Sequence, residues 1–97
     1  MAKVRAFGLN GLELWFNTND HLEPHFHVSP TSDDWEFRVF FLEAETLMFE
    51  AKRPKNAKLS GRIRRQLAQN SSANRQELLD QWNEVVPEEH KYPRKGR

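Results

Sequence analysis

The spacing of apolar residues along the chain changes once, near Pro54, and divides the chain into two halves. Before Pro54 apolar side chains mostly alternate with polar ones, and after it they recur at intervals of three or four. Alternation is typical of a strand with one buried face, whereas the longer interval places apolar side chains on one face of a helix. The pattern therefore predicts a sheet followed by helices.

The first half contains short apolar runs bounded by turn-forming residues. In one of them Leu12, Leu14 and Phe16 alternate with more polar neighbours, as one face of a strand requires. The dipeptide Asn10-Gly11, which precedes this run, strongly favours a hairpin because both of its residues tolerate positive φ. We expect four or five mainly antiparallel strands within about residues 3–51, over the runs 4–9, 12–17, 25–29, 35–41 and 47–51.

A single apolar stripe runs through the second half. It consists of Leu59, Ile63, Leu67, Leu78 and Trp82, which share one face when the chain is helical. The segment Asn70-Ser71-Ser72 interrupts helix propensity within the stripe. We therefore expect two helices, over about residues 57–69 and 73–86. One kinked helix would keep the same stripe in register, and it stays open as an alternative.

These elements define an α+β protein, in which an antiparallel sheet of four to five strands carries two C-terminal helices on one face. The helix stripe should pack on the sheet face that presents Leu14, Phe16, Phe37 and Val39. Residues 4–86 should form one domain, and Pro87 should begin a polar, basic and frayed tail over 87–97.

Composition removes several classes of protein. With 97 residues the chain is long enough for one domain, and its 11% aromatic content argues against disorder. The absence of cysteine excludes disulfides, thiolate metal clusters and a cysteine nucleophile. No apolar run is long enough to span a membrane, and the first residues lack the apolar region of a signal peptide. We expect a cytoplasmic protein that makes no contact with membranes.

Charge is distributed unevenly between the two halves. Residues 1–51 hold nine acidic and three basic residues, whereas residues 52–97 hold twelve basic and five acidic ones. The segment 52–75 is basic and contains no acidic residue. Such asymmetry indicates an anionic partner, nucleic acid or an acidic protein surface, or else a solvated helix face. The expected contact residues are Lys52, Arg53, Lys55, Lys58, Arg62 and Arg65.

Candidate chemistry is concentrated in one segment, Asn19-Asp20-His21-Leu22-Glu23-Pro24-His25-Phe26-His27. On a strand His25 and His27 project from the same face. We expect that face to be solvent-reachable, with Asp20 or His21 folded over it. Such a cluster can hold a divalent metal ion through His25, His27, Asp20 and His21. The alternatives are a structural, hydrogen-bonded cluster and an acid–base or proton-sensing role.

The sequence contains no complete enzymatic motif. Its four glycines are isolated, so no phosphate-binding loop is present, and no nucleophile elbow or zinc-protease helix motif occurs. A metal-dependent enzyme built on the histidines would need a further ligand and a general base. Glu13, Glu23 and Glu36 are the candidates for those roles.

Two sequence blocks carry a family resemblance. The first is Asn19-Asp20-His21, continued by Pro24-His25-Phe26-His27-Val28, and the second is Asn74-Arg75-Gln76-Glu77-Leu78-Leu79-Asp80-Gln81-Trp82. In this order they resemble the small bacterial domain-of-unknown-function family DUF4160, over about residues 4–86. Where the family often has a first proline, this chain has Glu23. The resemblance implies a protein encoded beside another small protein, in an arrangement like a toxin–antitoxin pair, and it assigns no catalytic residue.

Two functions from different classes remain as hypotheses. The first is an interaction module that pairs with the co-encoded protein and contacts nucleic acid through the basic segment. The second is a metal-dependent hydrolase or nuclease-like enzyme that uses the Asp/His cluster. The binding hypothesis is preferred, because it requires only the exposed charge that the sequence contains. The sequence leaves the oligomeric state open.

Overall fold

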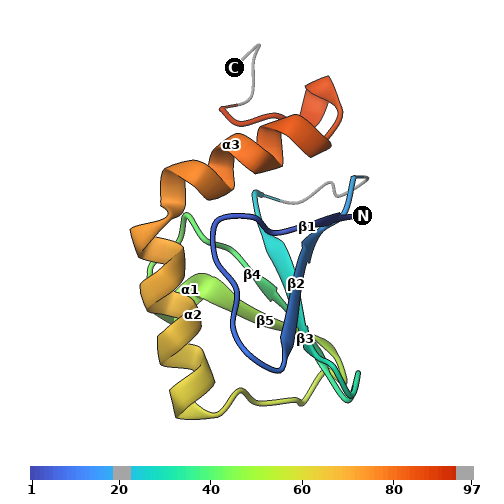
Figure 1. The fold of residues 1–97 in the computed structure, drawn as a ribbon, viewed down its shortest axis with the longest axis vertical. Coiled ribbons are helices and arrows are strands. Elements are labelled where there is room, and N and C mark those ends of the chain that lie inside the picture. Colours follow the sequence, from blue (N-terminus) through green and yellow to red (C-terminus); the bar gives the residue numbers. More distant parts are fainter. Residues whose placement is uncertain (19–22, 94–97) are drawn as a thin grey trace.

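Five antiparallel strands, placed side by side in chain order, form the sheet of this protein (Figure 1). The computed structural model describes residues 1–18 and 23–93. The strands are β1 (Ala2–Lys3), β2 (Leu12–Phe16), β3 (Phe26–Pro30), β4 (Glu36–Val39) and β5 (Phe49–Arg53). The helices are α1 (Glu45–Met48), α2 (Gly61–Ala73) and α3 (Arg75–Val85), followed by the 3-10 turn η1 (Glu88–His90). This arrangement confirms the predicted α+β class.

The register of the strands gives the sheet two different faces. Leu14 pairs with Val28, which pairs with Phe37, so apolar side chains line up across one face, the inner face. On the opposite, outer face Trp15 pairs with His27, which pairs with Arg38. Because side chains alternate along a strand, each strand supplies the core and the polar outer face at once.

Helices α2 and α3 pack on the inner face and close the core (Figure 1). Leu67, Leu78 and Trp82 are fully buried in the same apolar cluster as Phe16. The rings of Trp82 and Phe16 lie edge to face with centroids 6.4 Å apart. The predicted packing of the helix stripe on the sheet is therefore confirmed.

The helical segment is two helices separated at Asn74. Asn74 has φ −116° and ψ 24°, and its side chain donates a hydrogen bond back to the Asn70 carbonyl, 2.8 Å away. The first helix was expected to begin at residue 57, but it begins at Gly61. The Ser60 hydroxyl accepts a hydrogen bond from the Ile63 amide and so caps the helix there.

The expected strand over residues 4–9 is wrong. The N-terminal strand is β1, which pairs through Ala2 and Phe16. Beyond Val4 the backbone leaves the sheet, because the Arg5 amide donates to the Gln81 side chain of α3 instead of to a strand. The apolar side chains of this segment cover the core at its edge. The turn at Asn10-Gly11 is present, with Gly11 at φ 81°.

Two further boundaries differ from the prediction. Leu47 and Met48 belong to the helical turn α1, so the fifth strand begins two residues later than expected. The tail after Pro87 was expected to fray, yet its described part, residues 88–93, packs back against α3 through η1. The Trp82 indole donates to the His90 carbonyl oxygen, 3.1 Å away, and Asn83 exchanges two hydrogen bonds with the backbone of Tyr92. No helix among the described residues is long and apolar enough to cross a membrane.

Candidate functional site

His27 lies at the centre of a hydrogen-bond network on the outer face of the sheet. Its Nδ1 is 3.0 Å from a carboxylate oxygen of Glu36, and its Nε2 is 3.0 Å from the side-chain nitrogen of Asn17. Because the Asn17 amide donates to Nε2, the proton of the neutral imidazole resides on Nδ1 and is donated to Glu36. The two partners thereby fix the orientation of the ring.

Glu36 continues this network to the edge of the sheet. Its carboxylate is almost fully buried and lies 3.1 Å from the Lys52 ammonium and 3.4 Å from Nε of Arg53. Arg53 also donates to the Asp33 carboxylate, and this hydrogen bond raises the pKa of the Arg53 guanidinium, with a smaller contribution from Glu36. Burial removes the water that would otherwise solvate this carboxylate, and these partners take the place of that water.

His25 precedes β3 and is packed among aromatic rings. Its Nδ1 is 2.8 Å from the Glu23 carbonyl oxygen. Its ring centroid lies 5.0 Å from Phe40, 5.5 Å from Trp82 and 5.0 Å from His27. The short distance between the two imidazoles agrees with the expectation that alternation brings them together.

The expectation that this histidine face is solvent-reachable is wrong. His25 and His27 are 0% and 1% exposed. Phe40 and Trp82 lie against His25, and Trp15 stacks on His27. The alternation rule gives the face on which a side chain lies, but the rings that cover that face come from distant parts of the chain.

The proposed metal ligands Asp20 and His21 lie outside the described residues. Within residues 1–18 and 23–93, no group of three or more His, Asp or Glu side chains has a geometry that could hold a metal ion. Of the additional acidic candidates, Glu36 contacts His27 through its carboxylate, and Glu23 contacts His25 through its backbone oxygen. The four-residue metal site stays a prediction.

Some residues of the basic segment form ion pairs within the described part of the chain, and others do not. Lys52 and Arg53 are engaged with Glu36 and Asp33, as described above. Arg64, which was not among the expected contact residues, pairs with Glu45 and lies over the Phe49 ring. The other four expected contact residues are exposed and form no ion pair with a residue that the structure describes: Lys55, Lys58, Arg62 and Arg65.

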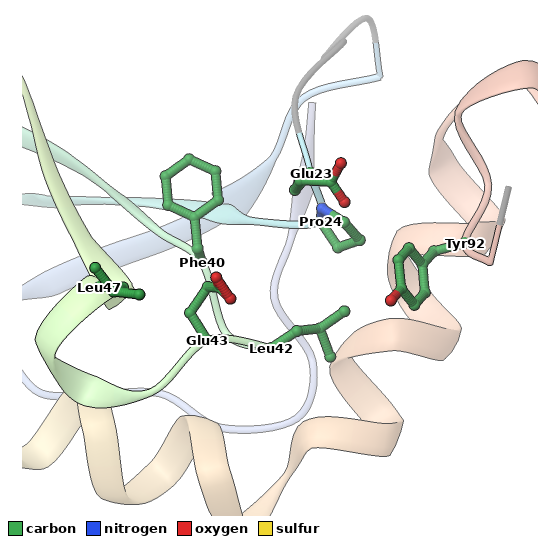
Figure 2. Close-up of a pocket in the computed structure, with 7 residues that line it drawn as sticks. All are labelled: Glu23, Pro24, Phe40, Leu42, Glu43, Leu47 and Tyr92. Carbon is green, nitrogen blue, oxygen red and sulfur yellow. The ribbon is translucent and has the colours of Figure 1, made fainter.

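A pocket of about 440 Å³ is lined in part by Phe40, whose ring contacts His25, and by Pro24, which precedes His25 in the sequence (Figure 2). Five of its lining residues are Pro24, Phe40, Leu42, Leu47 and Tyr92. The other two are Glu23 and Glu43, and we call the site the acidic pocket. Glu23 and Pro24 come from the loop before β3, the next residues from the β4–α1 turn and α1, and Tyr92 from the segment after η1 (Figure 2).

The acidic pocket combines exposed apolar surface with carboxylates that have no cationic partner within residues 1–18 and 23–93. The large apolar side chains exposed in the described part of the chain are Met1, Leu47 and Tyr92, and two of these three line the pocket. Leu47 is 68% exposed and Tyr92 is 37% exposed. Neither the Glu23 nor the Glu43 carboxylate forms an ion pair or hydrogen bond with a described residue. The surface is therefore suited to a ligand that is both apolar and cationic.

The sequence pattern does not indicate this pocket, although Glu23 stands out among the acidic residues near the histidines. The pattern predicts a strand at Leu47 and a frayed tail at Tyr92, and neither prediction indicates a pocket. One signal was present in the sequence, because Tyr92 is the only tyrosine and stands alone in a polar, charged segment. The contribution of Leu42 and Glu43 depends on the turn geometry after β4, which periodicity does not reveal.

Comparison with known proteins adds a family but no function. Residues 11–83 match the family model described as Domain of unknown function (DUF4160). No curated protein and no solved structure matches the chain. The matched range contains β2 to α2, most of α3, both histidines and every lining residue of the acidic pocket except Tyr92.

Proposed function

The chain belongs to the DUF4160 family, and on that premise we propose that it is a protein-binding module. Its acidic pocket takes a segment of a partner protein that presents a Lys or Arg beside an apolar side chain. The co-encoded small protein implied by the family resemblance is the candidate partner. The observation that carries the proposal is the grouping around one pocket of Leu47, Tyr92 and two carboxylates that pair with no cation in the described part of the chain.

The chemistry of the pocket supports a protein segment as its ligand. Exposed leucine and tyrosine side chains gain free energy when a partner removes them from water, and aromatic anchors are typical of interface centres. Glu23 and Glu43 add charge that selects for a cation and rejects acidic segments. The pocket is shared by three separate parts of the chain, so a folded domain is needed to form it.

In this proposal His25 holds two residues of the pocket in position. The hydrogen bond between His25 Nδ1 and the Glu23 carbonyl oxygen holds the backbone that carries one pocket carboxylate. The His25 ring also supports Phe40, which lines the pocket from the other side. His25 thus packs both on the core and on residues that line the pocket.

A peptide selection tests the proposal without a known partner. A random peptide library is selected on the wild type and on two matched variants, Leu47→Lys and Thr46→Lys. Both variants add one positive charge to α1, but Thr46 does not line the pocket. We expect enriched peptides to contain a Lys or Arg next to an apolar residue and to bind Thr46→Lys but not Leu47→Lys. Failure to enrich any sequence, or equal binding by both variants, would contradict the proposal.

Contact with nucleic acid is a second candidate function, and one observation favours it. Four exposed cations, Lys55, Lys58, Arg62 and Arg65, have no ionic partner within the described residues. Phosphate groups bind such clusters with little dependence on sequence and with a steep dependence on salt. This function would use a different surface from the acidic pocket, so the two can be tested separately.

A further inference from the structure

Within residues 1–18 and 23–93, the strand β5 forms one edge of the sheet, and β4 is the only strand that pairs with it. Among the described residues, no other backbone group is hydrogen-bonded to residues 49–53 outside the β4 ladder. The Phe40 amide donates to the Met48 carbonyl oxygen, 2.7 Å away. Because hydrogen-bonded and non-hydrogen-bonded pairs alternate along an antiparallel ladder, this bond determines which residues of β5 bond to β4. Phe49 and Ala51 therefore direct their N–H and C=O groups away from β4, toward the open edge.

The outer-face side chains along this edge alternate in charge. Glu50 is paired with Arg38 of β4, with 2.6 Å between the charged atoms. Lys52 is paired with Glu36 of β4, with 3.1 Å between the charged atoms. Both edge residues remain accessible, Glu50 at 54% and Lys52 at 38% side-chain exposure. An approaching strand would meet one negative and one positive side chain on the same face.

Backbone geometry restricts how a second copy of this edge can pair with the first. Two copies of β5 related by a two-fold axis would run antiparallel. They can form a hydrogen-bonded ladder only if the residues whose N–H and C=O groups point away from β4 lie opposite each other. An axis at Glu50 would oppose two glutamates, and an axis at Lys52 would oppose two lysines, both of which are unfavourable. An axis at Ala51 opposes the two small alanines and sets Glu50 of each copy against Lys52 of the other.

We propose that two copies of this chain associate through β5 in the register centred on Ala51. In that register the existing ion pairs extend across the interface as a row of alternating charge. The row runs from Arg38 to Glu50 in one copy and from Lys52 to Glu36 in the other, and the two-fold axis repeats it in reverse. Like charges exclude the neighbouring registers, so the same residues give attraction in one alignment and repulsion in the others.

The dimer should be weak, because each copy contributes only the five residues of β5 to the shared ladder. Such a contact is smaller than the interface of a typical stable complex. Association should therefore depend on protein concentration and should be seen by sedimentation equilibrium over a wide concentration range. We expect the wild type to dimerise reversibly.

Two charge variants test the register. In Glu50→Lys every facing pair is Lys against Lys, and in Lys52→Glu every facing pair is Glu against Glu, so each variant alone should sediment as a monomer. Mixed in equal amounts, they should form a heterodimer, because each lysine then faces a glutamate. A third variant, Ala51→Pro, removes an outward N–H without removing a bond to β4, and it should also be monomeric.

The outcomes decide the proposal directly. A wild type that stays monomeric at the highest concentration would overturn it, as would a dimer that persists in both Glu50→Lys and Ala51→Pro. Absence of a heterodimer in the mixture would overturn the register, provided that circular dichroism shows both variants to be folded. If Lys52→Glu does not fold, the loss of the dimer in Glu50→Lys and Ala51→Pro remains the required result.

Discussion

The indole of Trp15 lies flat on the imidazole of His27, with ring centroids 5.5 Å apart and ring planes 16° apart. The two residues are direct cross-strand partners in β2 and β3. This stacking covers the histidine, while Glu36 and Asn17 occupy its two nitrogens. The outer face of the sheet therefore contains a satisfied polar network under an aromatic cover, which accounts for the burial of a residue type that is often exposed.

Replacement of His27 should destabilise the domain. The variant His27→Leu fills a similar space but leaves the buried carboxylate of Glu36 and the amide of Asn17 without one partner each. We expect a loss of about 1–3 kcal/mol in the free energy of unfolding, measured by urea denaturation. The matched change Asn17→Ala removes only the more exposed partner and should cost less. An unchanged or higher stability of His27→Leu would show that the network contributes nothing.

The histidines should not bind a metal ion if their role is structural. Both nitrogens of His27 and the Nδ1 of His25 already face polar partners. We expect calorimetric titration of the untagged protein with zinc, manganese and nickel to be flat, and zinc to leave the melting temperature unchanged. Saturable binding that is lost in His25→Ala and His27→Ala would instead support the site with Asp20 and His21. Such a result would revive the enzyme hypothesis.

Trp82 is the largest side chain of the core and should be essential for stability. It is fully buried, contacts Phe16, and donates to the His90 carbonyl oxygen. Truncation to alanine should lower the free energy of unfolding by about 3–5 kcal/mol. Thermal and urea unfolding provide the measurement. A melting temperature equal to that of the wild type would contradict the burial of the Trp82 side chain of α3 against the sheet.

The exposed basic residues predict a specific salt dependence if they contact nucleic acid. Reversal of Arg62 and Arg65 to glutamate should reduce the slope of log affinity against log salt by about one to two units. The control Lys3→Glu reverses an exposed charge on β1, outside the basic segment, and should leave the slope nearly unchanged. Absence of any binding to duplex or single-stranded nucleic acid at low salt would eliminate this function.

The sequence pattern was sufficient for the architecture and for the core. Alternation placed Leu14 and Phe16 on the buried face, and the later stripe placed Leu67 and Trp82 against them. The two sequence blocks also indicated the family that the model match confirms. These features depend on local periodicity and on order along the chain, both of which a single sequence contains.

The parts that could not be predicted depend on contacts between distant segments. The chain leaves the sheet after Val4 because the side chain of Gln81, far along the chain, accepts a hydrogen bond from the Arg5 amide. His25 and His27 are buried because rings from other elements lie on them. The acidic pocket unites Glu23, Glu43 and Tyr92 from three separate segments. No local sequence pattern predicts that these distant segments lie close together, so the pocket can be identified only from the tertiary structure.

The affinity of one selected basic peptide for the wild type and its carboxamide variants tests the proposed function most directly. Isothermal titration is performed with Glu23→Gln/Glu43→Gln and with the control Asp34→Asn, whose exposed carboxylate lies at the opposite end of β4 and does not line the pocket. We predict that the double variant binds about three- to thirtyfold more weakly, as expected for two partly exposed charge pairs. The control should bind like the wild type. Equal affinities of the double variant and the wild type would contradict the assignment of the acidic pocket as the protein-binding site.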